Sequence, residues 1–504
     1  MLQKTLFEFC VDSIIEEMER EWGQKSSKVS DVVNPEVSSN PFEHLPTEIL
    51  EEVIRILRKK KLLKKYLRWI ILPQLHSLDL SLEGCKDRNK PVEKQMFEHL
   101  KCASVKCSML KNLNLTYNVL NEENFIGLLP TFKNLQVLDL AITSAGDNCL
   151  WALGTHCKYL RFLHLQFCRE VTDFGIKGLC LDYIEKEDDE DKRISKASEL
   201  EWQENCAPPR LSNSLEILYL EGTRVTEKGI QEALQKLRSL KVLGYHDTAY
   251  VLGEMHREDW ENPEKRNKIP KYALTKILFY ISNQTSIDRL QRVVSQCPLI
   301  TNLCMKGWDI LENAKFDGIM IPIFNMIGNS LEEFSLNFVI NFNLCTIIDC
   351  CPNLRKLTLN YGGWNTEPNV ENKKFSNIQE RKTLGKLQEL TLISVKISTD
   401  NLITLMSSSS LKSIVLIHCQ TFNDDILQQA YDQHSFPNLE YFELNYCPVT
   451  ERGINFLLNE KTPLKKIKII ESWQKYTKEI LEDWNLQMVL KNRQLDIEFL
   501  VIPF

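Results

Sequence analysis

The sequence of 504 residues lacks a long apolar run, and no uninterrupted stretch reaches the roughly 20 residues that a membrane-spanning helix needs. It also lacks a strong excess of one charge, since the formal net charge is only -6. That balance gives no electrostatic basis for binding nucleic acid or an anionic membrane. The amino-terminal residues carry acidic side chains from Glu8 onward, unlike a secretory signal. We therefore expect a cytoplasmic and/or nuclear protein that contacts neither nucleic acid nor a membrane.

Paired cysteines and catalytic motifs are also missing. The 16 cysteines include no C-x-x-C pair that faces a second such pair or a pair of histidines, so neither a zinc site nor a disulfide framework is indicated. Cys157, Cys168 and Cys419 instead flank short apolar segments, as buried reduced thiols do. Motifs for phosphate binding, dinucleotide binding, zinc proteolysis and serine hydrolysis do not occur. We expect no catalytic residue, no metal, no cofactor and no enzymatic activity of the chain itself.

One stretch, KYLRFLHLQFCREVTDFGIKGL from Lys158 to Leu179, contains a complete leucine-rich repeat. Leu160, Leu163 and Leu165 occupy the apolar positions of the pattern L-x-x-L-x-L, and Cys168 follows three residues later. The alternation of a strand points the leucines inward and the residues between them outward. One such unit cannot bury its own apolar face, so it needs copies on both sides.

Copies of this pattern follow one another along the chain. Leu113, Leu138 and Leu163, the middle leucines of three copies, are 25 residues apart, whereas the spacing in the carboxy-terminal half varies between 23 and 33. After each strand, a polar pair such as Thr172 and Asp173 can accept hydrogen bonds from the first N–H groups of a helix. The middle apolar residues of the other copies are Leu78, Leu218, Leu243, Leu303, Phe334, Leu357, Leu390, Ile414, Phe442 and Ile467.

These repeats predict an α/β solenoid, a leucine-rich-repeat horseshoe with parallel strands on the concave face and helices on the convex face. We assign residues 1–70 to a small helical head and residues 71–504 to roughly thirteen repeats. An acidic insertion near 181–212 reads as a solvated loop, and an irregular stretch near 250–288 reads as helical without a strand. The final QLDIEFLVIPF is expected to form an edge strand that closes the stack.

A solenoid offers a long recognition surface rather than a closed pocket. Outward-facing residues of the predicted strands are the candidate contacts for a protein substrate, and exposed aromatic side chains are the usual anchors of such interfaces. The candidates are Asn112, Asn114, Phe162, His164, Gln166, Tyr219, Glu221, Tyr441, Glu443 and Asn445.

The head begins with an amphipathic helical segment over residues 1–24, whose predicted apolar face contains Leu6, Cys10 and Ile14. Residues 5–14, TLFEFCVDSI, resemble a BC box, in which a small residue, a leucine, a cysteine and an aliphatic residue recur at fixed spacing. The resemblance implies that Leu6, Phe9, Cys10 and Ile14 bind the elongin B/elongin C adaptor.

A second helical segment in the head, residues 41–57, contains LPTEILEEV and resembles a cullin box. That resemblance implies cullin contacts by Leu45, Pro46, Ile49 and Val53. The same segment is also similar to the start of an F-box, which would imply a Skp-type adaptor. The residues that follow match an F-box poorly, and an F-box would leave residues 5–22 without a role.

A BC box, a cullin box and leucine-rich repeats in this order resemble the ZYG/ZER family of ubiquitin-ligase substrate receptors, without the armadillo-like domain of that family. The resemblance implies a substrate-recognition subunit of a cullin-RING E3 ubiquitin ligase, with elongin B/elongin C and a cullin as partners. The alternatives are an F-box receptor of an SCF-type ligase and a repeat scaffold outside any ligase. The basic run from Arg58 to Arg68 is interpreted as a solvated helix face, a nuclear-import signal or a contact for the cullin.

Overall fold

The computed structural model describes residues 6–22, 42–60, 62–81, 90–118, 121–180, 211–281, 286–307, 316–338, 342–360, 383–395, 397–458, 462–471, 478–491 and 493–501. The chain divides into two compact units, Met1–Asp247 and Thr248–Phe504. The boundary falls inside the range that the sequence assigned to one repeat domain, and the helical head belongs to the first unit. The predicted acidic insertion lies almost wholly outside the described residues.

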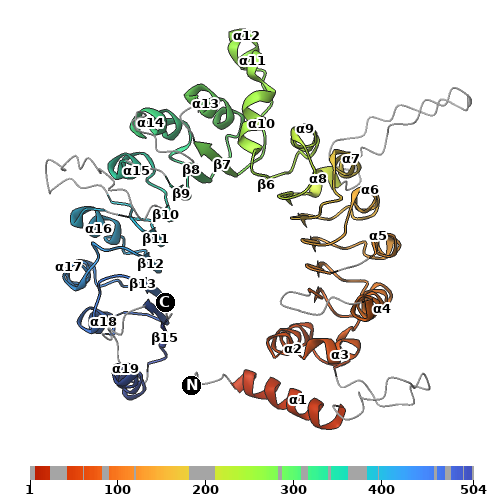
Figure 1. Cartoon of the computed structure of the whole chain (residues 1–504), viewed down its shortest axis with the longest axis horizontal. Coiled ribbons are helices and arrows are strands. Elements are labelled where there is room, and N and C mark those ends of the chain that lie inside the picture. The colour runs from red at the N-terminus through yellow and green to blue at the C-terminus, as the bar shows by residue number, and fades with distance from the viewer. Residues whose placement is uncertain are drawn as a thin grey trace, which may run out of the picture. The chain divides into compact units, whose positions relative to one another are not determined.

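The first unit consists of three head helices followed by strands that alternate with helices (Figure 1). Its strands are β1 (Ser77–Asp79), β2 (Asn112–Asn114), β3 (Val137–Asp139), β4 (Phe162–His164), β5 (Ile217–Tyr219) and β6 (Val242–Gly244). Its helices are α1 (Leu6–Trp22), α2 (Thr47–Lys59), α3 (Leu63–Ile70), α4 (Lys90–Lys106), α5 (Glu122–Ile126), the 3-10 helix η2 (Leu129–Thr131), α6 (Asp147–His156), α7 (Asp173–Leu179), α8 (Leu211–Ser214) and α9 (Glu227–Lys236).

The second unit repeats the alternation with longer strands. The strands are β7 (Lys276–Ile281), β8 (Asn302–Gly307), β9 (Glu333–Asn337), β10 (Lys356–Asn360), β11 (Glu389–Ile393), β12 (Ser413–Ile417), β13 (Tyr441–Asn445), β14 (Lys466–Glu471) and β15 (Asp496–Val501). The helices are α10 (Thr248–Met255), α11 (Arg257–Glu261), α12 (Pro263–Arg266), α13 (Ile287–Gln296), α14 (Phe316–Ile327), α15 (Leu344–Cys350), α16 (Thr399–Met406), α17 (Asp424–His434), α18 (Glu451–Leu457) and α19 (Lys478–Leu490).

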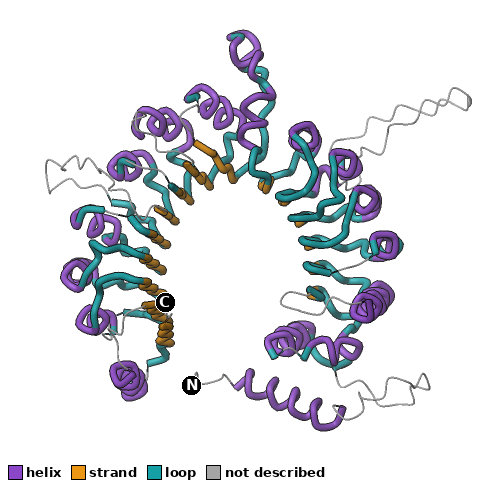
Figure 2. The backbone as a smooth tube through the Cα atoms, in the orientation of Figure 1, coloured by secondary structure: helices purple, strands orange, loops and turns teal. Residues whose placement is uncertain are grey.

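Each unit contains one parallel sheet whose strands follow in chain order, β1 to β6 in the first and β7 to β15 in the second. The strands line one face and most of the helices lie on the other (Figure 2). Inward positions such as Leu138, Leu163 and Leu357 are fully buried between the two layers. The fold is therefore a leucine-rich-repeat solenoid in each unit, as the repeat pattern predicted. None of the described helices is both long and apolar enough to span a membrane.

Buried side chains beneath the turns hold neighbouring repeats together. The Cys168 thiol, which the sequence placed under its turn, is fully buried and donates to the carbonyl of Leu140 at 3.0 Å. In the second repeat, Asn118 fills the same position and donates from Nδ2 to the carbonyls of Leu80 and Leu115, each at 2.9 Å. The thiol and the amide both donate a hydrogen bond to a buried carbonyl, which would be costly to leave without a donor.

Polar residues at the helix starts cap their own helices, as predicted for Thr172, and also connect neighbouring repeats. Thr172 accepts a hydrogen bond from the Phe174 N–H and so caps its own helix α7. Asp147 of the preceding repeat accepts from the Thr172 N–H at 2.7 Å, and Asp173 in turn accepts from the Thr226 N–H at 2.7 Å. The starts of α7 and α9 are therefore each fixed by a carboxylate of the preceding repeat.

One predicted element is wrong. Residues 276–281 were read as part of a helix, and they form β7, the first strand of the second sheet. Leu274, Ile277 and Phe279 are buried at the three apolar positions of the repeat, so the pattern is present with Ile and Phe in place of leucine. The apolar Leu278 between them obscured the alternation. With β7 and the terminal β15, the two sheets contain six and nine strands, more than the roughly thirteen expected.

The last strand is an edge strand but does not close the apolar core. Among the described residues β15 pairs only with β14, and its inward residues Ile497 and Phe499 are only half-buried. In β14 the equivalent Ile467 and Ile469 are fully buried. The adjoining helix α19 exposes Leu486, Val489 and Leu490.

Candidate functional site

Helix α1 presents two faces, and the buried one differs from the prediction. Val11 and Ile15 are buried, whereas Cys10 is exposed, Phe9 is 59% exposed and Ile14 is half-buried. The sequence placed Cys10 and Ile14 on the helix's apolar face, and packing uses the neighbouring positions one residue later instead. The surface that the BC-box resemblance assigns to an adaptor is therefore accessible at Phe9 and Cys10. Leu6 begins the helix, and its side chain lies outside the described residues.

Ionic and apolar contacts join α1 to the rest of the head. Asp12 is buried and pairs with the Lys60 ammonium group at 2.5 Å. Lys60 terminates α2, so the ion pair fixes α1 against the end of α2. Docking through Val11, Ile15 and this ion pair leaves the opposite face of α1 exposed to solvent.

The cullin-box-like segment is divided between surface and core. Pro46 is exposed, Leu45 and Ile49 are half-buried, and Val53 is fully buried inside the head. Val53 therefore packs in the core of this chain and is inaccessible to a partner in this conformation, unlike the contact that the resemblance implied. The remaining buried residues of α2 are Leu50, Ile54, Ile56 and Leu57, so the core packs on Leu50 rather than on the neighbouring Ile49.

The basic run packs as an amphipathic surface, in line with the first of its three interpretations. The Arg58 guanidinium binds the Asp79 carboxylate and the Ser81 hydroxyl at the end of β1. Leu63 and Leu67 of α3 are buried. The head is thus attached to the first repeat by an ion pair as well as by apolar packing.

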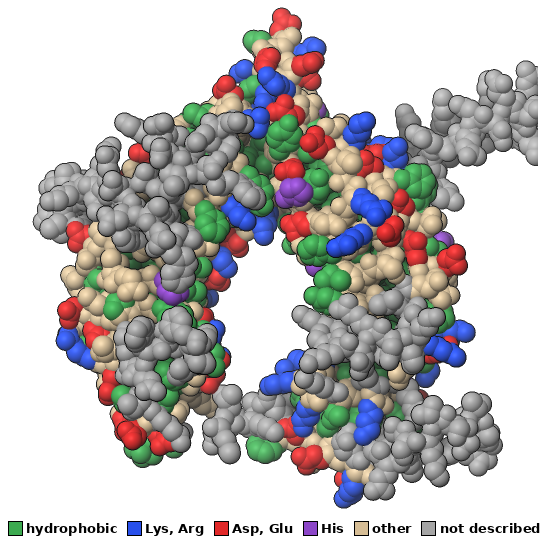
Figure 3. Space-filling model, viewed as in Figure 1, with side chains coloured by type: hydrophobic (Ala, Val, Ile, Leu, Met, Phe, Trp, Pro, Cys, Tyr) green, Lys and Arg blue, Asp and Glu red, His purple; other side chains and the backbone are tan. Residues whose placement is uncertain are grey.

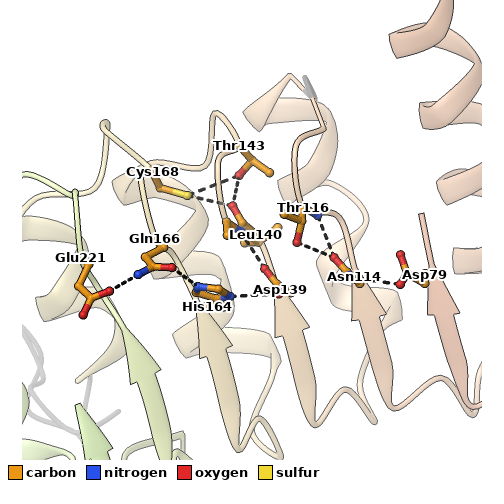
Figure 4. A network of polar contacts seen from close by, with 11 residues as sticks. Asp79, Asn114, Thr116, Asp139, Leu140, Thr143, His164, Gln166, Cys168 and Glu221 are labelled. Carbon is orange, nitrogen blue, oxygen red and sulfur yellow. Dashed lines mark hydrogen bonds and ion pairs between the residues drawn. The ribbon is translucent and has the colours of Figure 1, made fainter. Parts of the chain in front are cut away.

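Four of the predicted substrate contacts of the first unit, Asn114, His164, Gln166 and Glu221, make side-chain hydrogen bonds on its strand face (Figure 4). Asn114 donates at 3.2 Å to the Asp79 carboxylate, which also binds Arg58. Farther along, His164 Nδ1 lies 3.0 Å from Asp139 Oδ2, and His164 Nε2 lies 3.0 Å from Gln166 Oε1. The Gln166 amide then donates to the Glu221 carboxylate.

Electrostatics favour the protonated form of His164. Burial by itself lowers the pKa of His164, but the hydrogen bonds to Asp139 and Gln166 and the nearby Glu221 charge outweigh it, and the pKa is raised. Burial likewise acts to raise the pKa of Asp139, yet the hydrogen bonds from His164 and the Ala141 N–H lower it. Both ring nitrogens face oxygen atoms, so an imidazolium ion can donate in both directions.

Three rings lie beside this network. The ring centroid of Tyr219 is 5.2 Å from that of His164 and 5.8 Å from that of Phe162. Tyr219 packs directly over Gly244 of the next strand, where an added Cβ would collide with the tyrosine ring. The half-buried Phe162, His164 and Tyr219 form a connected aromatic surface of the kind that anchors protein interfaces.

Sequence reasoning missed most of a row of apolar residues on the same face. Val137, Phe162, Ile217 and Val242 are paired across β3, β4, β5 and β6, and all four are half-buried. We call them the apolar row. Each directly precedes the middle leucine of its repeat, so this fixed position is the signal that could have found them. Asn112 occupies the same position in β2 and continues the row as a polar residue.

The predicted contacts of the second unit converge on one carboxylate. Glu443 accepts hydrogen bonds from the Tyr441 hydroxyl at 2.5 Å, the Asn445 amide at 3.0 Å and the Lys468 ammonium group at 3.0 Å. Burial acts to raise the pKa of Glu443, but these three donors lower it below its usual range. Lys468, on the neighbouring strand β14, was not identified from the sequence.

Asn445 is not the exposed contact that the sequence predicted. Its side chain is 7% exposed, because Ile417 and Ile470 flank it on the adjacent strands. Its Nδ2 donates to Glu443, and its Oδ1 has no hydrogen-bond partner among the described residues. Asn445 therefore orders Glu443 and is unavailable to a substrate in this conformation.

A second row of side chains was also missed. The residue two positions after the last apolar residue of a repeat adopts a left-handed backbone conformation, as at Tyr117 (φ 65), Phe167 (φ 60) and Tyr446 (φ 53). Non-glycine residues rarely adopt it, but here each N–H is bonded to the next repeat, for example Phe167 to the Glu221 carbonyl at 2.8 Å. Phe167 and Phe338 expose their rings at this position.

Two further properties of the described surface bear on what it could bind. No group of three or more His, Cys, Asp or Glu side chains within the described ranges could hold a metal ion. In the view of Figure 3, acidic and basic side chains are mixed over the described surface of each unit, and neither charge sign covers a large area. These surfaces suit the recognition of a protein.

Comparison with known proteins supports no family assignment. No protein-family model matches the sequence, and no curated protein matches it significantly. Solved structures do match. Yeast Rad7, crystallised as a complex with Elc1, is 13% identical with a TM-score of 0.41, over 96% of this chain and 91% of that one.

Two further solved structures resemble the chain more weakly. The TLR13–ssRNA13 complex is 15% identical with a TM-score of 0.34, over 80% of this chain and 46% of that one. The leucine-rich-repeat protein LegL7 from Legionella pneumophila is 13% identical with a TM-score of 0.27, over 83% of this chain and 91% of that one. At such values the matches say nothing about what this chain binds, and its own sheets define it as a leucine-rich-repeat protein.

Proposed function

We propose that this chain is the substrate-recognition subunit of a cullin-RING E3 ubiquitin ligase. The head would bind elongin B/elongin C and a cullin, and the strand faces of the repeats would bind the protein substrate. The chain would contribute proximity rather than catalytic groups, by holding a substrate lysine near a ubiquitin-charged enzyme.

The two-faced helix α1 carries the proposal. A helix that only capped the repeats would bury its BC-box residues, whereas Cys10 is exposed and Phe9 is 59% exposed. The helix is held through Val11 and Ile15 instead. An exposed aromatic ring beside a small thiol on an already docked helix is a surface that a partner can bury without unfolding the head.

The second candidate is an F-box receptor with a Skp-type adaptor. It is favoured by the accessibility of Pro46 and the partial exposure of Leu45 and Ile49, which begin the F-box-like segment. That candidate predicts contacts through α2 and none through Phe9 or Cys10.

Co-purification from cells tests these alternatives. The full chain is expected to retain elongin B and elongin C, and the double substitution Leu6→Ser with Cys10→Phe is expected to abolish their retention while the circular dichroism of the repeats is unchanged. Ser13→Ala, at another exposed position of α1, is the matched control and should retain both. Retention of a Skp-type adaptor would transfer the assignment to the F-box class, and recovery of neither adaptor would reject a ligase function.

A further inference from the structure

The apolar row of the first unit is a continuous surface with no equivalent in the second. In β3 to β6 its members are Val137, Phe162, Ile217 and Val242, adjacent in the parallel register. Register within the second sheet puts charged or polar residues at this position, including Glu333, Lys356, Glu389, Ser413, Tyr441 and Lys466. The apolar row is therefore a feature of the first sheet alone and not of the repeat pattern that both sheets share.

The spacing of the row indicates the conformation of a partner. Neighbouring strands lie about 4.8 Å apart, so three intervals span about 14 Å. An α-helix that crosses the strands presents apolar residues at i, i+4, i+7 and i+11 over about 16 Å. An extended chain that uses alternate residues needs about 20 Å for four contacts. The helix fits the row better.

Charges along the two sides of the row differ in sign. On the side toward the strand starts, Arg161 and Lys241 both bind Glu216, with Nε and Nζ each 2.9 Å from a carboxylate oxygen. Two cations share one carboxylate there, which leaves one positive charge in excess.

The side toward the strand ends has the opposite composition. His164 is hydrogen-bonded to Asp139 and Gln166, and Gln166 in turn donates to Glu221. This side therefore has two carboxylates and one imidazole. Negative charge is in excess on this side whether or not His164 is protonated. A partner that covered the row would meet a basic edge and an acidic edge.

We propose that the apolar row binds an amphipathic α-helix of the protein partner, with acidic residues along the flank over Arg161 and Lys241 and basic residues along the flank over Asp139 and Glu221. This inference rests on the proposed function in that it names the class of substrate that the receptor would take. Phe162, which belongs to both the apolar row and the aromatic surface, would be the main anchor.

Three fluorescent peptides of 18 residues test the proposal with the full chain. All carry Leu at i, i+4, i+7 and i+11; one has a Glu flank and a Lys flank, one has Glu on both flanks and one has Lys on both. A peptide with the Glu and Lys flanks exchanged would not serve as a control. It could bind in the opposite chain direction and still place Glu over the basic edge and Lys over the acidic edge. Fluorescence anisotropy should show the mixed peptide binding at least tenfold tighter than either of the others. Equal binding of all three would overturn the proposal.

Substitutions in the chain locate the site. Phe162→Asp and Ile217→Asp should each weaken binding of the mixed peptide at least tenfold, with unchanged circular dichroism. Ser413→Asp, at the same position of a strand in the second sheet, is the matched control and should bind like the unsubstituted chain. Unchanged binding by both row variants would overturn the proposal. No adaptor is present in the assay, so failure here is distinguishable from failure to retain elongin B and elongin C.

Discussion

The two sheets of this chain have the same repeat skeleton and different exposed faces. Strands β1 to β6 each contain three residues, and their exposed face combines the apolar row with a hydrogen-bonded polar network. Strands β7 to β15 contain five or six residues, and their exposed face has charged and polar residues at the position of the apolar row, some of them in ion pairs between neighbouring strands. Examples are Lys356 with Glu389 at 2.6 Å and Lys466 with Glu498 at 2.5 Å.

This difference separates what the fold requires from what recognition requires. The inward leucines, the buried Cys or Asn under the turn and the carboxylate caps recur in both sheets because each repeat must dock on the next. Satisfied ion pairs cost a partner more to desolvate than an apolar row does. We therefore expect the first sheet to provide the principal recognition surface.

The largest expected effect comes from breaking the shared skeleton. An added Cβ at Gly175 in the first unit or at Gly453 in the second would collide with the capping carboxylate of Asp147 or Asp424. Gly175→Ala and Gly453→Ala should each lower the free energy of unfolding by about 2–3 kcal/mol. Hydrogen exchange followed by mass spectrometry should show the loss of protection in the substituted unit.

Gly385→Ala is the control for this pair. No atom lies within 4 Å of the Cβ that would be added, so its effect should stay within about 0.5 kcal/mol. An equal loss of protection in Gly385→Ala and Gly453→Ala would contradict the role given to the capping carboxylates.

The second prediction compares the residues beneath the turns. Asn118→Ala removes the donor to two buried carbonyls and should cost about 2–3 kcal/mol. Cys447→Ala in the second unit removes a weak S–H donor 3.5 Å from the Leu416 carbonyl and should cost about 1 kcal/mol. Urea denaturation monitored by circular dichroism measures both, and a larger effect of Cys447→Ala would reverse the expected order.

The third prediction concerns the hydrogen-bonded network around His164 in the first sheet. The pKa of His164 is raised above its usual 6.5, so its contribution to stability is fully present below pH 6.5 and is lost as the pH rises through the raised value. The pKa of Asp139 is lowered from 3.8, so its contribution is present above pH 3.8 and is lost as the pH falls through the lowered value. The network therefore stabilises the first unit most between about pH 4 and 6.5.

Asp139→Asn tests this balance. Without the carboxylate, the hydrogen bond and the negative charge of Asp139 are both lost, so the pKa of His164 should be lower than in the unsubstituted chain, as a titration of the imidazole signals by NMR would show. Tyr441→Phe, which touches only the second sheet, should leave the titration unchanged. An unchanged His164 pKa in Asp139→Asn would contradict the role given to Asp139.

The smallest effect is expected at the end of the second sheet. Val489 is 74% and Leu490 is 76% exposed, so replacing both with Lys should change the free energy of unfolding by less than about 0.5 kcal/mol. Less self-association at high concentration is expected, because an exposed apolar surface is removed beside an edge strand. Light scattering measures this, and a large loss of stability would show that these side chains are part of the core.

Most of the skeleton could be predicted from the sequence because its physical signal is local. Leu113, Leu138, Leu163, Leu218 and Leu243 all lie in the strands expected of them, since alternation and spacing alone specify a buried leucine in a repeat. β7 was missed because a continuous apolar run hides the alternation when Ile and Phe replace leucine.

The site was less predictable because it depends on contacts between distant residues. The sequence identified Phe162, His164 and Tyr219 as exposed, but not that Asp139 and Gln166 would hold both nitrogens of His164. Asn445 was misassigned because its burial arises from neighbours on two other strands. For α1 the pattern predicted the helix but placed its packed face one residue too early, because Cys10 and Val11 are almost equally apolar.

Hydrogen exchange of the full chain with and without elongin B and elongin C tests directly whether α1 binds the adaptor. We predict slower exchange in peptides that cover residues 6–22, where Phe9 and Cys10 would be buried by the adaptor, and no change in β7 to β15. Unchanged exchange in residues 6–22 at saturating adaptor would contradict it.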